Sequence, residues 1–146
     1  MKSNADEAVK MFSEGFNCAQ SGLVCCGKGL PIGRDAALAV AGPFGAGMGN
    51  MGKTCGAVTG AMMAIGLKHP RLDPKDDASR QATIRLAREL AARFEARNGS
   101  IVCKDLLGCD LSTPEGMEQF KARDLKNTVC AKAVRDAAEI LDEILD

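Results

Sequence analysis

The sequence contains no tryptophan and no tyrosine, and only five of its 146 residues are phenylalanine. Aromatic side chains stack on the bases of single-stranded nucleic acids, and aromatic and β-branched residues favour strands, so this shortage disfavours both that function and a β-sandwich. Net charge is also missing, because 19 basic residues balance 19 acidic ones. The chain therefore lacks the basic footprint of a nucleic-acid-binding protein.

Long apolar runs and a secretory signal are absent as well. The most apolar stretch, residues 54–67, is shorter than the about 20 residues that span a bilayer, so we expect no membrane insertion. The first seven residues are polar and acidic, with no apolar segment behind them. This pattern predicts no signal peptide and hence a cytoplasmic location.

What the chain does contain suits closely packed helices. Its length fits one domain over residues 1–146, and 46% apolar with 26% charged residues is the composition of a globular protein. Sixteen glycines and many alanines allow helices to approach one another closely. We predict an all-α, single-domain compact bundle of about five to seven helices, with a glycine-rich loop before the central helix.

Apolar residues recur at helical spacing along most of the chain. Asn17, Thr54, Ser100 and either Asn127 or Thr128 are predicted helix caps. The predicted helices cover residues 5–26 with a break or kink at 15–17, 35–41, 54–67, 76–97, 100–107, a segment that starts at 112–115, and a last helix after 127 or 128.

Seven cysteines are the main chemical feature of the sequence. An odd number in a reducing compartment argues against a disulfide framework. Four of them, Cys18, Cys55, Cys103 and Cys130, fall in the first turn of a predicted helix, where free N–H groups and the helix dipole favour thiolate over thiol. Four thiolates can ligate an iron–sulfur cluster or a zinc ion, although no local C-x-x-C spacing is present.

The remaining cysteines and the single histidine have different predicted roles. Cys25 and Cys26 lie within or at the end of a predicted helix and are interpreted as structural. Cys109 follows the helix-stopping Gly108 and is a reserve ligand or a redox partner for Cys103. His69 is predicted to be a solvated turn residue.

Residues 47–54 match the phosphate-binding pattern G-x-x-x-x-G-K-[ST] letter for letter. That loop requires a strand before it and a parallel sheet around it. Here Pro43 and an alanine-rich helical segment precede it, so we interpret the glycines as residues that let the backbone turn tightly. Nucleotide binding stays a minor alternative.

Several motifs resemble the C-GCAxxG-C-C family of small redox-active proteins. The passages 15–20, 44–60, 103–108 and 130–134 correspond in order to the family's four cysteine motifs, although the central element reads Cys-Gly-Ala here. Residue by residue, the resemblance carries over Cys18, Cys55, Cys103 and Cys130 as the cofactor-binding and metal-binding set.

The family is similar to the cluster-bearing part of split-Soret cytochrome c, a dimeric haem protein with a cysteine-ligated iron–sulfur centre. The resemblance implies an iron–sulfur cluster, with 2Fe-2S favoured over 4Fe-4S, electron transfer or redox sensing, a redox partner protein and a homodimer. Haem is not implied, because no C-x-x-C-H segment is present. Two alternatives stay open: a thiol-disulfide oxidoreductase with Cys55 as nucleophile, and a structural four-cysteine zinc site in a helical module.

Overall fold

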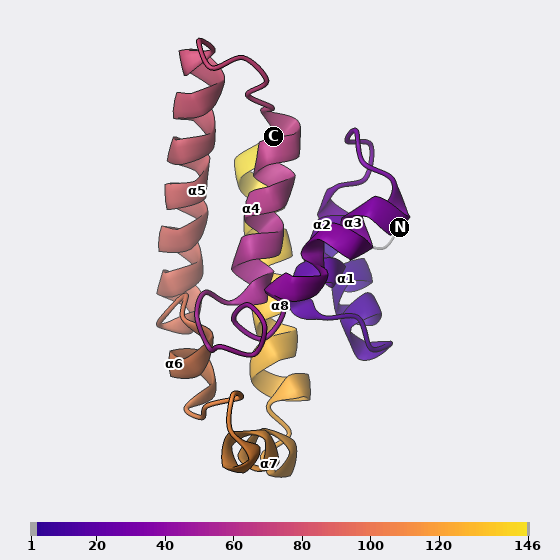
Figure 1. Ribbon diagram of the computed structural model, residues 1–146, viewed down its shortest axis with the longest axis vertical. Helices are drawn as coiled ribbons and strands as arrows, with labels where there is room; N and C mark the ends of the chain where they lie inside the picture. Colours follow the sequence, from indigo (N-terminus) through magenta and orange to yellow (C-terminus); the bar gives the residue numbers. More distant parts are fainter. Residues whose placement is uncertain (1–2, 146) are drawn as a thin grey trace.

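The computed structural model describes residues 3–145, and their regular structure is helical (Figure 1). These residues contain no β-strand, only an isolated antiparallel bridge between Thr54 and Val102. The all-α prediction is confirmed, although eight α-helices are found rather than about five to seven. They are α1 (Asn4–Ser13), α2 (Cys18–Cys26), α3 (Arg34–Ala41), α4 (Gly56–Lys68), α5 (Asp77–Asn98), α6 (Cys103–Leu107), α7 (Pro114–Ala122) and α8 (Ala131–Leu145), with a 3-10 turn η1 (Gly42–Phe44) and a π-helical turn η2 (Lys126–Cys130).

The predicted break between α1 and α2 is confirmed. Gly15 has a φ of 112°, a positive value that glycine adopts readily because it has no side chain. Asn17 then caps α2 with a reciprocal pair of hydrogen bonds: its Oδ1 accepts from the N–H of Gln20 at 2.8 Å, and its N–H donates to Gln20 Oε1 at 3.0 Å. This capping box places Cys18 at the first residue of α2.

Three helix starts differ from the prediction. Thr54 does not cap α4, because it lies in the bridge to Val102 and Cys55 takes the N-cap position. Ser100 is not a cap either: its Oγ accepts from the N–H of Val102, and α6 begins at Cys103. Asn127 and Thr128 lie inside the π-helical turn that leads into α8.

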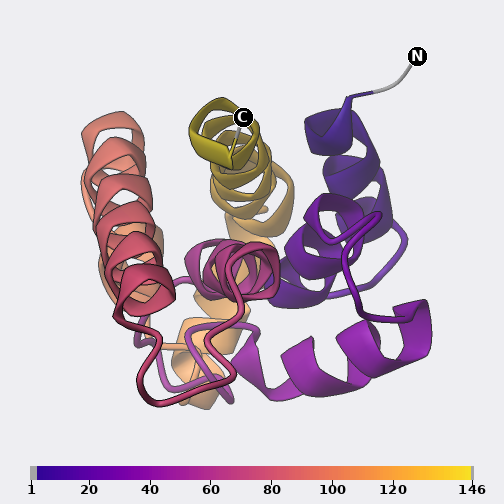
Figure 2. The ribbon, with the colours of Figure 1, turned by 90° about the horizontal axis from the view of Figure 1, so that it is seen from above.

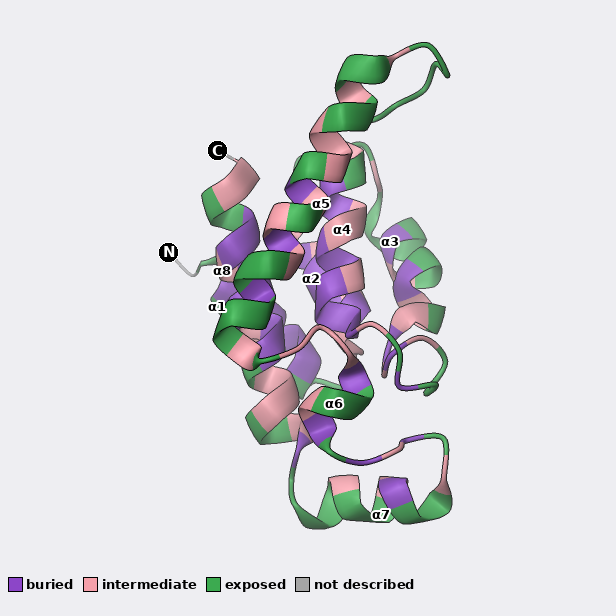
Figure 3. Cartoon of the chain, turned by 90° about the vertical axis from the view of Figure 1, so that its left-hand side faces the viewer, coloured by how far each residue is buried: buried purple, intermediate pink, exposed green. Residues whose placement is uncertain are grey.

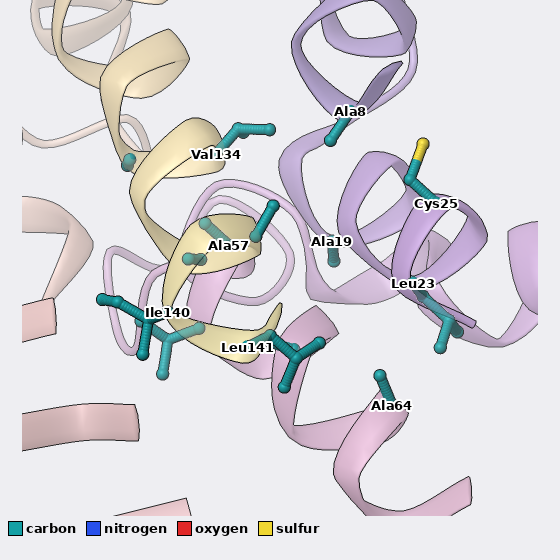
Figure 4. Close-up of a cluster of buried hydrophobic side chains, with 14 of the residues drawn as sticks. Ala8, Ala19, Leu23, Cys25, Ala57, Ala64, Val134, Ile140 and Leu141 are labelled. Atoms are coloured by element: carbon teal, nitrogen blue, oxygen red, sulfur yellow. The ribbon is translucent and has the colours of Figure 1, made fainter. Parts of the chain in front are cut away.

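Helix α4 lies in the middle of the bundle, with α5, α8, α2 and α3 around it (Figure 2). Small residues let α2 and α4 approach closely: a Cβ atom at Gly60 would lie 2.6 Å from the carbonyl oxygen of Ala19. Figure 4 shows Ala8, Ala19, Ala57 and Ala64 between the larger side chains of the core. The short side chains thus set the spacing of the helices.

Helices α6 and α7 form the lower end of the molecule (Figure 3). A second buried cluster there contains Cys103, Leu107, Cys109, Leu111 and Leu125. Cys130 packs against both this cluster and the main core. No helix among residues 3–145 is long and apolar enough to cross a membrane.

Candidate functional site

A cavity of about 210 Å³ lies where the α1–α2 turn, the start of α4, α6 and η2 meet. Cys18, Cys55, Cys103 and Cys130 all line this cavity. The structure thus brings together four cysteines that are 37, 48 and 27 residues apart in sequence order. We call it the thiol cavity below.

Two backbone hydrogen bonds join the segment that contains Cys55 to the segment that contains Cys103. The N–H of Cys55 donates to the carbonyl oxygen of Ile101 at 2.7 Å, and the N–H of Cys103 donates to that of Lys53 at 2.6 Å. These two bonds flank the bridge between Thr54 and Val102. Cys55 and Cys103 are therefore held by backbone, so their placement does not depend on a bound ligand.

Cys18 lies against the first turn of α4. Backbone N–H groups of Ala19, Ala46 and Gly56, together with its own, lie near its sulfur and act to lower the pKa of the Cys18 thiol, against the larger effect of burial. Gly56 is the first residue of α4 and Ala19 the second of α2, so their N–H groups have no partner within the helices. A Cβ atom at Gly56 would overlap Cys18 Sγ. The sulfur of Cys18 thus lies in a space lined by backbone groups, which we call the cradle. A residue larger than glycine at position 56 would fill this space.

The glycine-rich loop supplies part of this cradle. Residues 46–50 and Gly52 all have positive φ, including the three non-glycine residues Ala46, Met48 and Asn50. The N–H of Lys53 closes the loop on the carbonyl oxygen of Gly47 at 2.9 Å. The elements before the loop are α3 and η1 and not a strand. The loop therefore lacks the strand that a phosphate-binding loop requires, and this contradicts the nucleotide alternative.

Cys130 is placed by the π-helical turn. Its N–H donates to the carbonyl oxygen of Leu125, five residues back, at 3.0 Å. The sequence predicted Cys130 in the open first turn of a helix, and this is wrong because its N–H already has a partner. Single π-helical turns occur frequently at functional sites.

Burial raises the pKa of all four thiols. The pKa of Cys103 and that of Cys130 rise to about 12, mainly through burial and then through the neighbouring Cys18. The pKa values of Cys18 and Cys55 are also raised, although the N–H groups around Cys18 act in the opposite direction. The predicted thiolate preference is therefore wrong for the metal-free chain. A bound metal cation would reverse it, since coordinating thiols lose their protons.

The rest of the thiol cavity is largely apolar. Three of the five phenylalanines line it, namely Phe12, Phe16 and Phe120, and Lys126 is the single charged side chain among its described lining residues. Lys126 was not predicted from the sequence, since it lies outside every recognised motif. Within residues 3–145, no three cysteine, histidine or carboxylate side chains lie close enough together to hold one metal ion.

The other cysteines lie outside this lining. Cys25 is buried in the main core, with its sulfur 3.5 Å from Met11 Sδ, and the half-buried Cys26 packs against the same core. Cys109 lies in the second cluster with Cys103 and adds to the raised pKa of the Cys103 thiol. His69 caps the end of α4 and is half-buried.

Comparison with known families gives a match over most of the chain. A family model described as "Putative redox-active protein (C_GCAxxG_C_C)" matches residues 16–144. The chain belongs to this family. The match spans all four cysteines of the thiol cavity in this C_GCAxxG_C_C protein, and the family description gives it a redox role. Searches of curated proteins and of solved structures found no match.

Proposed function

We propose that this C_GCAxxG_C_C protein binds an iron–sulfur cluster through Cys18, Cys55, Cys103 and Cys130 and serves in electron transfer or redox sensing. The observation that carries the proposal is the convergence of these four thiols on one cavity from four separate segments. Cysteine thiolates are the usual ligands of such clusters. A bound cluster would supply one-electron redox chemistry.

The chemistry of the donor set fits such a group. N–H groups at a cluster sulfur and an apolar shell tune the reduction potential, and the cradle at Cys18 and the phenylalanines of the lining provide both. The cavity of about 210 Å³ is smaller than the about 300–1,000 Å³ of common pockets for organic ligands. A compact inorganic group therefore suits the volume better than a flavin or a nucleotide. We favour 2Fe-2S over 4Fe-4S on the family resemblance.

The raised pKa of Cys55 weighs against the oxidoreductase alternative. An attacking thiol reacts as thiolate and performs best when its pKa is near the ambient pH. Burial moves the pKa of Cys55 away from that range. The zinc alternative needs the same four cysteines around one ion, whereas no three such side chains among residues 3–145 lie close enough together to hold one. Metal analysis tests this alternative directly.

The decisive measurement is iron, zinc and acid-labile sulfide content, with a visible spectrum, on protein purified without oxygen. Equal amounts of iron and sulfide are expected. A colourless protein with one zinc ion per chain would contradict the proposal, and so would metal-free protein after cluster reconstitution has been attempted.

Paired variants test the ligand set. Cys130→Ser is expected to bleach or shift the visible spectrum, whereas Cys26→Ser, which lies outside the cavity lining, is expected to leave it unchanged. Equal effects of both would contradict our assignment. The homodimer and the cytoplasmic location stay predictions, and light scattering of the purified protein tests the first.

A further inference from the structure

Lys126 is the one charged residue among the described residues that line the thiol cavity. Its Nζ lies 5.6 Å from the centre of the Phe12 ring, which also lines the cavity. No carboxylate of residues 3–145 lies within ion-pair distance of this ammonium group. Its charge is therefore not neutralised by a neighbouring side chain.

The π-helical turn joins this charge to a predicted ligand. Lys126 begins η2 and Cys130 ends it, so both belong to the same turn. The N–H of Ala131, just after Cys130, donates to the carbonyl oxygen of Lys126. Both Lys126 and Cys130 are half-buried, which places them where solvent and cavity meet.

We propose that Lys126 places a positive charge at the opening of the thiol cavity. This charge acts on the thiolates of the cavity and on a group bound to them. For the bound cluster the inference rests on the proposed function. Four thiolates outweigh the positive charge of an iron–sulfur core, so the assembled site is an anion in an apolar cavity. A nearby ammonium stabilises such an anion, because charges interact more strongly where water is excluded.

The charge also has a redox consequence. Reduction adds one electron to the cluster and makes the site more negative. Lys126 therefore stabilises the reduced form more than the oxidised form and raises the reduction potential. Lys126 is not itself a ligand, so it would act on the cluster only through its charge.

The first test uses metal-free protein with its thiols reduced. Two aromatic disulfides are compared: 5,5′-dithiobis(2-nitrobenzoate), which is a dianion, and 2,2′-dithiodipyridine, which is neutral. In both, a cysteine thiolate attacks one sulfur, the disulfide bond of the reagent breaks, and the other half leaves as a thiolate. Mass spectrometry of peptides gives the rate at each cysteine.

Lys126→Met is expected to lower the ratio of dianion rate to neutral rate at Cys130 by about threefold or more, because steering by charge commonly changes association rates by 10-fold to 10³-fold. Lys126→Arg keeps the charge and should keep the ratio. Cys26, outside the cavity, serves as the internal control. Lys121→Met removes an exposed lysine on α7 that does not line the cavity and should leave every ratio unchanged.

The second test uses the cluster-loaded protein. Lys126→Met is expected to lower the ratio of reduced to oxidised cluster about tenfold at a fixed potential, which corresponds to 59 mV for a one-electron couple. Lys126→Arg should restore the wild-type potential. An unchanged reagent ratio together with an unchanged potential in Lys126→Met would overturn the inference.

The two tests separate this inference from the proposed function. If wild-type protein holds no cluster but Lys126→Met changes the reagent ratio, the charge inference stands and the iron–sulfur proposal fails. If a cluster forms and neither readout moves, the iron–sulfur proposal stands and the role of Lys126 is wrong.

Discussion

Gly56 and Cys18 are in such close contact that a Cβ atom at Gly56 would overlap the Cys18 sulfur. The contact joins the first residue of α4 to the first residue of α2. It also brings the N–H of Gly56 near Cys18 Sγ, where this N–H acts to lower the pKa of the thiol. The glycine is therefore part of the site and not only of the helix packing.

Gly56→Ala is expected to displace Cys18 and to abolish or strongly reduce cluster binding. The added methyl group would meet the sulfur and also two backbone groups, the carbonyl oxygen of Phe44 and the N–H of Ala19, which cannot move aside as a side chain can. Overpacking of this kind costs about 1–3 kcal/mol. Urea unfolding gives the loss of stability, and iron content after reconstitution gives the loss of binding.

Gly66→Ala on the same helix is the matched control. Gly66 is exposed, and a Cβ atom there would have no neighbour within 4 Å. Replacing a glycine within a helix by alanine stabilises it by about 0.5–1 kcal/mol. Gly66→Ala should therefore gain stability and keep full iron content, and equal losses in the two variants would disprove the contact argument.

The metal-free protein is expected to lose stability as the pH rises above 9. Burial raises the pKa of Cys103 and Cys130 to about 12 in the folded chain, from an ordinary value of 9.0. Between these values the unfolded chain has lost thiol protons that the folded chain retains, so the free energy of unfolding decreases with pH. Below pH 9 this contribution to stability is fully present.

Urea unfolding between pH 8 and pH 10.5, with chelator and reductant present, measures this slope. Each such thiol lowers the free energy of unfolding by at most about 1.4 kcal/mol per pH unit, and solvent screening reduces the effect for partly exposed groups. Cys103→Ser removes one titrating group and should flatten the slope. A slope unchanged by this variant would contradict the burial argument.

The sequence predicted the helices well where the signals are local. The break at 15–17 and the cap at Asn17 depend on one or two neighbouring residues, and both are confirmed. The helix predicted over 76–97 ends one residue later, at Asn98, where Gly99 with its positive φ caps it. The bridge that displaces the start of α4 joins Thr54 to Val102, which are 48 residues apart, and no local pattern reports such a contact.

The four cysteines near predicted helix starts all line one cavity, and their role as ligands stays a prediction. The environment of these cysteines could not be predicted. Their protonation was predicted wrongly, because burial depends on how α6, η2 and α4 pack together. Burial raises the pKa of all four thiols and outweighs the N–H groups near Cys18 and Cys55. Lys126 was not predicted for the same reason: only the packing of the helices shows that this lysine lines the cavity.

Asp136 should be the most important carboxylate for holding α5 against α8. It is buried, and its carboxylate accepts from Asn98 Nδ2 at 3.1 Å and from Lys132 Nζ at 2.7 Å. Asp136→Ala would remove both hydrogen bonds, of which the one from Asn98 joins α5 to α8, at a cost of about 1–3 kcal/mol. Urea unfolding measures it. Glu89→Ala, which breaks only an exposed ion pair with Arg93, should cost less than about 1 kcal/mol.

Deletion of Asn127 tests what the π-helical turn contributes. Asn127 is exposed, and removing one residue would let the turn adopt ordinary α-helical hydrogen bonds. Each residue of an α-helix turns the chain by about 100°, so Lys126 would rotate by that angle relative to Cys130. We expect the helix content by circular dichroism to be retained while iron binding is lost.

Deletion of Lys75, exposed between α4 and α5 and away from the cavity lining, is the control and should keep its iron. Full iron binding by the Asn127 deletion would show that the extra residue of the turn has no part in placing Cys130.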